Sequence, residues 1–276
     1  MLSQIRRDIV DHNLDEKIAI LSFEMEMLGV DQVTRDISSK IEMSTKQLYS
    51  ADSEEDPLSP KELAKVDKIA DSMKYYPISI IDEIGTVNQI RDSILEFVET
   101  NQLIENSIGL VVTFDHSLLV DAADGDSEKD VVDSLYRTLV KLKKHFESIG
   151  LRSIFIVLSQ LNRNIESTER VINPNLQYPN KTDLFASSAA FYCSDVVIIT
   201  HKPILVEGIR EYYGPTRGLE YPCGLPTRDP DSGKPMIYWH IIKSRFSTNR
   251  ILMMVDDFVN SRILEYHPKP ITQTSS

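Results

Sequence analysis

The sequence is organised around Ile154–Glu166, IFIVLSQLNRNIE, in which an apolar run passes without a break into polar residues. The continuous apolar run Ile154–Leu158 predicts a strand buried on both faces, as in a parallel sheet. Open α/β sheets bind ligands just past the carboxyl ends of their strands. Gln160 and Arg163 follow the run, so we predict that they face a bound phosphate. The plainer alternative is a strand that runs into a polar surface loop.

Composition limits the classes of protein to which the chain belongs. Its 276 residues carry a net charge of −12, and the hydrophobic fraction of 41% is ordinary for a globular protein. The negative charge argues against general coating of nucleic acid but leaves room for a locally basic DNA path. No apolar run approaches the roughly 20 residues that span a bilayer, and no signal peptide is evident. Cys193 and Cys223 lack metal-site spacing, so we expect reduced thiols and a cytoplasmic protein.

Hydrophobic periodicity and capping signals predict alternating strands and helices over the first two thirds of the chain. Strands are expected at 17–23, 77–82, 108–114, 154–158 and 195–200, and helices at 1–10, 30–43, 60–73, 86–102, 131–148 and 184–193. A long loop is expected at 162–183 and a surface insertion at 202–236. Three further β segments, at 237–243, 250–255 and 262–266, are close enough in sequence to pair antiparallel.

This order of elements predicts one α/β domain over residues 1–267, followed by a disordered tail at 268–276. Its central sheet is expected to be mostly parallel and flanked by helices, with antiparallel strands at the C-terminal end.

Carboxylate and amide side chains stand just past three of the predicted strands. Glu24, Asp115 and Gln160 each follow an apolar run. In a parallel sheet these strand ends lie along one edge. One carboxylate for a metal ion, a second for water activation and an amide for a phosphate oxygen are the parts of a phosphoryl-transfer site. Each carboxylate alone is equally explained as the first polar residue of a surface loop.

Five segments occur in the order and spacing of the RecA-like motor domain of DnaB-type replicative helicases of superfamily 4, which the chain resembles over about residues 1–266. They are SFEM (22–25), VVTFDHSLLV (111–120), LSQLNRNIES (158–167), SSAAFYCSDVVIITHK (187–202) and IIKSRF (241–246). The resemblance implies a RecA-like fold of the P-loop NTPase superfamily and an ATP-dependent DNA helicase that uses ATP and Mg²⁺. It further implies a homo-oligomer, expected as a hexameric ring on single-stranded DNA, with a primase or a helicase loader as partner and no membrane.

The resemblance also assigns roles in hydrolysis to individual residues. Glu24 matches the glutamate that activates the attacking water. Asp115 matches the Walker B aspartate that holds Mg²⁺, usually through water. Gln160 matches the amide that senses the γ-phosphate, and Arg163 of the same motif is expected to contact phosphate or to support that loop.

Cations farther along the chain match residues that act on a neighbour or on DNA. Lys243 and Arg245 match the basic pair that is offered to the ATP of the neighbouring subunit, with Arg245 as the arginine finger. Side chains two apart on a strand point the same way, so both can reach one phosphate. Arg163, Arg170 and Lys181 are the cations available in the loop that resembles a DNA-gripping channel loop.

The sequence departs from the family pattern at the phosphate-binding loop. It contains no G-x-x-x-x-G-K-[S/T], and its one Gly-Lys pair, Gly233-Lys234, is followed by Pro235 and reads as a turn. We expect that the chain begins just after the P-loop and that this polypeptide alone has little or no ATPase activity. A non-catalytic or split subunit that docks on an intact helicase remains an alternative, as does a RecA/RadA-type recombinase or clock-type ATPase. His116 also replaces the tyrosine usual after the Walker B aspartate.

Overall fold

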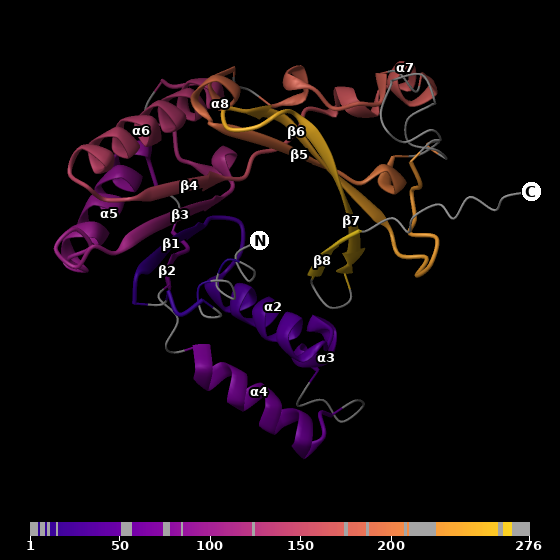
Figure 1. The fold of residues 1–276 in the computed structure, drawn as a ribbon, viewed down its shortest axis with the longest axis horizontal. Coiled ribbons are helices and arrows are strands. Elements are labelled where there is room, and N and C mark those ends of the chain that lie inside the picture. Colours follow the sequence, from indigo (N-terminus) through magenta and orange to yellow (C-terminus); the bar gives the residue numbers. More distant parts are fainter. Residues whose placement is uncertain are drawn as a thin grey trace, which may run out of the picture. The chain divides into compact units, whose positions relative to one another are not determined.

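The computed structural model describes residues 5, 9, 12–14, 16–50, 57–73, 78–83, 85–122, 125–173, 176–185, 188–206, 209, 225–258 and 262–266. Its strands form two four-stranded sheets (Figure 1). Contacts between Cα atoms divide the chain into two compact units. Unit 1 comprises residues 1–161, 184–194 and 259–261, and unit 2 comprises residues 162–183, 195–258 and 262–276.

Unit 1 contains a parallel sheet in the order β2-β1-β3-β4. The strands are β1 (Ile18–Glu24), β2 (Ile78–Ile81), β3 (Gly109–Asp115) and β4 (Ser153–Val157). The register of β1 on β3 pairs Phe23 with Phe114 and Glu24 with Asp115. The two phenylalanine rings stack with centroids 4.9 Å apart within the main hydrophobic core. The two carboxylates that the sequence places after strands therefore lie at one edge of the sheet.

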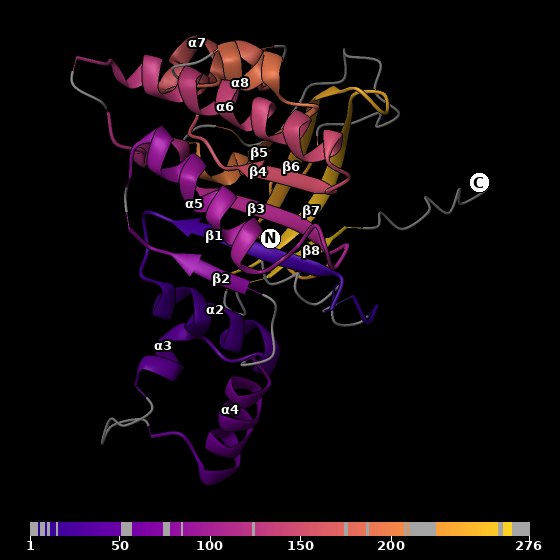
Figure 2. The same cartoon turned by 90° about the vertical axis from the view of Figure 1, so that its left-hand side faces the viewer.

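Helices cover this sheet on the side where its main core lies. The helices of unit 1 are α2 (Gly29–Ile41), α3 (Thr45–Tyr49), α4 (Pro60–Met73), α5 (Val87–Thr100), α6 (Glu128–Ser148) and α8 (Ser188–Cys193), with the 3₁₀ turn η1 at Ser117–Leu119. Helices α5 and α6 lie side by side against the sheet, whereas α2, α3 and α4 lie beyond its β2 edge (Figure 2). None of the described helices is long and apolar enough to cross a membrane.

Local capping explains where α4, α5 and α6 begin. Capping boxes at Ser59–Glu62 and Thr86–Gln89 are present as reciprocal hydrogen bonds. Helix α6 begins at Glu128, three residues before the predicted start, because Ser127 and Asp130 form a further box. The S-x-x-D signal for this start is visible in the sequence, although it lies within a stretch that reads as an acidic loop.

Unit 2 contains an antiparallel sheet in the order β5-β6-β7-β8. Its strands are β5 (Val196–His201), β6 (Met236–Ser244), β7 (Arg250–Asp257) and β8 (Arg262–Glu265). Strand β5 pairs antiparallel with β6, so it belongs with the C-terminal strands and not with the parallel sheet. The predicted long loop at 162–183 contains short helical segments, namely η2 (Arg163–Glu166), α7 (Thr168–Ile172) and η4 (Lys181–Asp183), and η5 (Pro203–Leu205) follows β5.

The prediction that the strand at 154–158 is buried on both faces is wrong. Ile154 is 59% exposed and Leu158 is 41% exposed. The reason is position: within the described part of the chain β4 pairs only with β3, so it forms an edge of its sheet. An apolar run predicts the strand itself but not the number of its neighbours.

Some expectations lie wholly or partly outside the described residues. Of the helix expected at 1–10 only Ile5 and Ile9 are described, both as helical. The disordered tail expected at 268–276 also lies outside the described residues, as do residues 207, 208 and 210–224 of the surface insertion expected at 202–236. The expected division into one domain and a tail stays a prediction.

Candidate active site

A ladder of hydroxyl and carboxyl groups lies at the carboxyl ends of β1 and β3. Ser22 and Glu24 alternate on β1, and the residues beside them on β3 are Thr113 and Asp115. The Ser22 hydroxyl donates to Glu24 Oε1 at 2.5 Å, and the Ser22 and Thr113 hydroxyl oxygens are 2.6 Å apart. Because the single Ser22 proton goes to Glu24, Thr113 is the donor to Ser22. The ladder holds a carboxylate that is only 2% exposed.

Asp115 lies beside Glu24 in a more open position. Its backbone carbonyl accepts a hydrogen bond of 2.9 Å from the Met25 N–H, which ties the ends of β1 and β3 together. Burial raises the pKa of the Asp115 carboxyl, and the negative charge of Glu26 raises it further. His116 and Arg35 act in the opposite direction on this pKa. An anion that is partly desolvated and close to a second anion gains from a cation nearby.

The oxygen atoms at this edge are of the kind that Mg²⁺ prefers. Carboxylate oxygens of one or two residues, together with water and phosphate oxygens, are the usual ligands of a catalytic Mg²⁺. Among the described residues no group of three or more His, Cys, Asp or Glu side chains is arranged to hold a metal ion by itself. Asp115, with Glu24 beside it, therefore fits Mg²⁺ held largely by water and substrate. The amide cradle for the phosphates of ATP needs a P-loop sequence, which these 276 residues do not contain.

Gln160 is brought to this edge through His116. The Gln160 amide group lies 3.2 Å from His116 Nε2, and His116 is the residue after Asp115. The backbone holds both segments, since Ser117 N–H donates to the Leu158 carbonyl at 3.0 Å and Phe185 N–H donates to the Gln160 carbonyl at 3.1 Å. The structure thus brings Asp115, Glu24 and Gln160 to neighbouring strand ends within unit 1.

Lys243 and Arg245 lie in unit 2 at the end of β6. Lys243 is on the strand and half-buried, and Arg245 is the residue directly after the strand. Arg245 Nη1 lies 2.8 Å from an Asp195 carboxylate oxygen, and the Arg245 N–H donates to the Asp195 carbonyl at 3.0 Å. The Arg245 side chain remains 56% exposed. It is therefore held by its own chain but still open to solvent.

The remaining cations divide into two exposed residues and one buried residue. Arg163 and Lys181 are exposed at the starts of η2 and η4, and neither forms an ion pair with another described residue. The Asn162 side-chain amide donates to the Thr182 carbonyl at 2.6 Å, which joins the two segments. Arg163 and Lys181 are thus placed to meet an anion from outside.

The structure contradicts the expectation that Arg170 binds DNA. It is 7% exposed, and its guanidinium donates to both carboxylate oxygens of Asp183, which is fully buried. The same guanidinium donates to the carbonyls of Leu176 at 2.8 Å and Tyr178 at 2.7 Å. A cation used in this way stabilises the fold of residues 162–183 and is not offered to a phosphate.

Sequence reasoning missed three polar residues at the site. Ser22 and Thr113 are polar residues within otherwise apolar strands, each two positions before a carboxylate, and this i, i+2 pattern would have found them. His116 was noted as a departure from the family, but its contact with Gln160 links residues 44 positions apart. No local pattern predicts such a contact.

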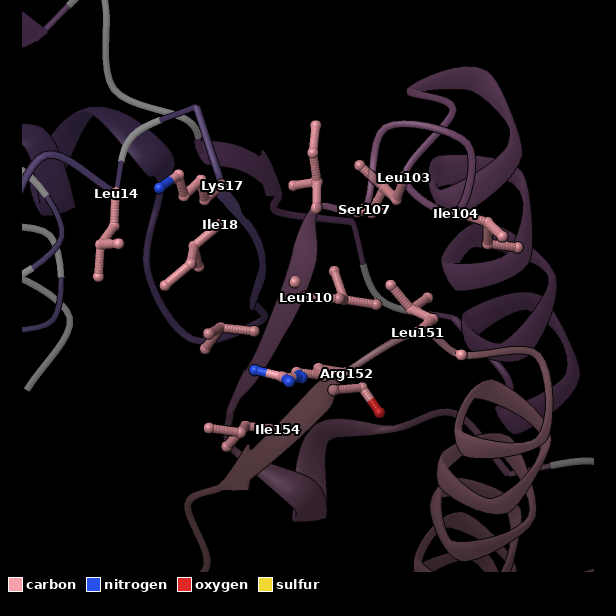
Figure 3. A pocket seen from close by; sticks show the side chains of 15 residues that line it. Leu14, Lys17, Ile18, Leu103, Ile104, Ser107, Leu110, Leu151, Arg152 and Ile154 are labelled. Carbon is pink, nitrogen blue, oxygen red and sulfur yellow. The ribbon is translucent and has the colours of Figure 1, made fainter.

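A cavity of about 730 Å³ lies at the opposite, amino ends of the same strands. It is lined mainly by apolar side chains, including Ile18, Leu110 and Ile154, with the cationic ends of Lys17 and Arg152 among them (Figure 3). None of the predicted site residues lines it. The chemistry expected of the chain therefore belongs to the carboxyl ends of the strands and not to this cavity.

The parallel sheet flanked by helices, together with the antiparallel sheet, is the RecA-like fold. One solved ATPase domain has this fold, with a TM-score of 0.70 at 14% identity, over 96% of this chain and 79% of that one. A solved structure of a DnaB-like replicative helicase and its interactions with primase matches with a TM-score of 0.69 at 15% identity, over 95% of this chain. This chain spans 53% of that second protein.

The family itself follows from the sequence. The model of the DnaB-like helicase C-terminal domain matches residues 2–215, and the chain belongs to that family. No curated protein matches the sequence. The expected family and RecA-like fold class are confirmed.

Proposed function

We propose that the chain is the motor domain of an ATP-dependent replicative DNA helicase, which couples ATP hydrolysis at subunit interfaces to movement along single-stranded DNA. The observation that carries the proposal is the pairing of Glu24 with Asp115 at the carboxyl ends of β1 and β3, with Gln160 one contact away. This is the combination of side chains that phosphoryl transfer requires. Membership of the DnaB-like helicase family supports it.

Each site residue has a distinct role in this proposal. Glu24, oriented by Ser22, takes a proton from the attacking water. Asp115 would hold Mg²⁺ through water, and the Gln160 amide donates to an oxygen of the terminal phosphate. Bound Mg²⁺ and ATP supply the electrophilic phosphorus and the charge that stabilises the leaving group. Arg163 lies just past Gln160 and is proposed to support the loop or to contact phosphate.

Other residues act between subunits and on DNA. Lys243 and Arg245 are proposed to reach the ATP of the neighbouring subunit in a homo-oligomeric, hexameric ring, where Arg245 stabilises charge in the transition state. Arg163 and Lys181 are proposed to contact the phosphates of single-stranded DNA. A primase or a helicase loader is the proposed protein partner, as the related structure with primase suggests.

The test compares the chain alone with the same chain preceded by the P-loop strand and loop of a DnaB-like helicase. Hydrolysis of ATP with Mg²⁺ is measured with and without single-stranded DNA. We expect ATP turnover only from the extended chain and not from the chain without the P-loop. Single-stranded DNA should stimulate this turnover, and the Glu24→Gln variant of the extended chain should lose it. An extended, folded chain that hydrolyses no ATP, or one whose turnover survives Glu24→Gln, would refute the proposal.

A split subunit that docks on an intact helicase is the second candidate, and the open edge of β4 favours it. Ile154 on this edge strand and Leu158 directly after it are exposed, as expected of a strand that pairs with another chain. Such a subunit would donate Arg245 to a neighbour. The discriminating experiment adds this chain to a DnaB-like helicase whose own arginine finger is substituted. Restored ATPase with the natural chain, but not with its Arg245→Ala variant, would favour docking, whereas unchanged activity would exclude it.

A further inference from the structure

His116 is a buried residue that lies between Asp115 and Gln160 in the proposed site. It is 9% exposed and stands at the start of η1, directly after Asp115. Its two ring nitrogens have different neighbours. The Leu118 backbone N–H donates to Nδ1 at 3.3 Å. Nε2 lies 3.2 Å from the side-chain nitrogen of Gln160 and 3.7 Å from a Glu26 carboxylate oxygen.

The contact at Nδ1 determines what Nε2 can do. A backbone N–H is always a donor, so Nδ1 is an acceptor, and the neutral ring then carries its proton on Nε2. An Nε2–H cannot bond to the NH₂ end of an amide, because both groups are donors. The contact is satisfied only when the amide turns its oxygen, Oε1, toward the ring. The oxygen and nitrogen of an amide have nearly the same size, so either orientation fits the space.

We propose that His116 is a positioning residue that holds the Gln160 amide with Oε1 toward the imidazole and NH₂ toward the ligand. The proposal rests on the proposed function, in which Gln160 meets the terminal phosphate. The Gln160 backbone is held separately by Phe185, so the ring is needed only to choose between the two orientations of the amide. With NH₂ outward, Gln160 presents donors alone, which suit a phosphate oxygen and not a cation.

Glu26 carries a second acceptor near the ring. Its carboxylate oxygen is 3.7 Å from Nε2, beyond hydrogen-bond distance, and its side chain is 61% exposed. Gln160 lies closer to Nε2 than Glu26 does, and its backbone is held in place. The Gln160 amide is therefore the partner of the Nε2–H. The Glu26→Gln substitution should therefore leave the orientation of Gln160 unchanged.

The first test is the ring tautomer of His116 in the natural chain. Two-bond ¹⁵N–¹H spectra of histidine-labelled protein distinguish a protonated ring nitrogen from an unprotonated one. We expect the proton on Nε2 and an unprotonated Nδ1, in the natural chain and in its Glu26→Gln variant alike. A proton on Nδ1 would overturn the proposal, because Nε2 would then accept from the NH₂ of Gln160.

Two substitutions separate positioning from support of the turn. His116→Asn keeps an acceptor near the Nδ1 position for Leu118 N–H, whereas His116→Gln keeps a donor near the Nε2 position for Gln160. We expect His116→Gln to preserve, and His116→Asn to lose, the restricted mobility of the Gln160 side-chain amide in ¹⁵N relaxation. The backbone ¹⁵N–¹H spectrum controls for folding. If the restricted mobility of the Gln160 amide is instead preserved in His116→Asn and lost in His116→Gln, His116 serves only to cap the turn through Leu118 N–H.

The outcomes of these tests are independent of catalysis. Neither measurement needs nucleotide, so absence of ATP turnover would refute the proposed function and leave the tautomer and mobility results standing. If ATP turnover is observed but Nδ1 carries the proton, the positioning role is refuted and the proposed function stands.

Discussion

Two carboxylates, Glu24 and Asp183, are buried in different ways. Glu24 in unit 1 is 2% exposed and accepts from the Ser22 hydroxyl, which itself accepts from Thr113. Asp183 in unit 2 is 0% exposed and receives the Arg170 guanidinium on both oxygens, together with the Asn180 N–H at 2.8 Å. Glu24 accepts from a hydroxyl group, and Asp183 is paired with a guanidinium.

The difference separates a carboxylate suited to chemistry from one that maintains the fold. Hydroxyl donors orient a carboxylate without cancelling its charge, so it can still take a proton. A bidentate guanidinium offsets the charge of the carboxylate. Removing a partner should therefore affect stability most at Asp183, and removing the charge should affect activity most at Glu24.

The largest expected effect is on stability, at Arg170. Arg170→Met leaves Asp183 as a buried, unpaired anion, and breaking a buried pair in this way costs about 3–5 kcal/mol of unfolding free energy. Urea denaturation measures the loss. The exposed Arg163→Met variant of the same unit is the matched control and should stay within about 0.5 kcal/mol of the natural chain. Equal stability of the two variants would contradict the assignment of Arg170.

Glu24→Gln should have the opposite profile. Its amide retains an oxygen that accepts from Ser22, so we expect the unfolding free energy to change by less than about 1 kcal/mol. Loss of the proposed general base should lower hydrolysis by about 10²–10⁴-fold in the chain extended with a P-loop. The control is Glu26→Gln, a change at an exposed carboxylate near the same edge. A large loss of stability without loss of turnover would make Glu24 a structural residue.

Acid should weaken the Asp183 region through two neutral histidines. Burial lowers the pKa of His201 to about 4, with Arg170 acting in the same direction and Asp183 opposing it. Burial also lowers the pKa of His240 to about 3, and His201 contributes to that shift. The unfolded chain, with histidine pKa values near 6.5, binds protons first as the pH falls, so stability decreases below about pH 6.5 and continues to decrease toward pH 4.

The slope of that decrease is at most about 1.4 kcal/mol per pH unit for each histidine. Urea denaturation between pH 7 and pH 4 measures it. His240→Gln should flatten the slope, and His145→Gln, a change at an exposed residue on α6, should not. Equal slopes in all three chains would show that buried histidines do not set the acid limit.

Ser22→Ala tests the hydroxyl ladder itself. Loss of the donor to buried Glu24 should cost about 1–3 kcal/mol of unfolding free energy. The matched control is Ser153→Ala in the same sheet, because the Ser153 hydroxyl has no hydrogen-bond partner within the described residues. A control that destabilises as much as Ser22→Ala would remove the reason to treat the ladder as a unit.

The smallest effect is expected at the exposed Arg245–Asp195 pair. It has the same chemistry as Arg170–Asp183, but its side chains are 56% and 27% exposed. Asp195→Asn should therefore change the unfolding free energy by no more than about 1 kcal/mol. It should also increase the mobility of the Arg245 side chain in ¹⁵N relaxation. A cost comparable with that of Arg170→Met would mean that exposure does not govern the strength of these pairs.

The sequence predicted the elements better than their neighbours. Periodicity and caps located every described strand to within about two residues. The same signals carry no information on pairing partners. For this reason the sequence did not show that β4 is an edge strand, and β4 was expected to be buried on both faces. Nor did it show that β5 pairs within the antiparallel sheet.

For the site, a polar residue after an apolar strand was enough to find Glu24, Asp115 and Gln160, because strand direction brings such ends together. Arg170 failed for a physical reason. Its partner Asp183 lies 13 positions away in a segment that reads as loop, and only the folded chain shows that the two meet. The roles of all the site residues remain predictions, namely those of Glu24, Asp115, Gln160, Lys243, Arg245, Arg163 and Lys181.

The open edge of β4 has a consequence for handling the protein in solution. Within the described residues β4 pairs only with β3, so a strand of another molecule can align along its other edge, near the exposed Ile154. We therefore expect self-association that grows with concentration and is slowed by Ile154→Lys. Light scattering of the two chains over a concentration series would measure how far the solubility of the protein depends on this one strand.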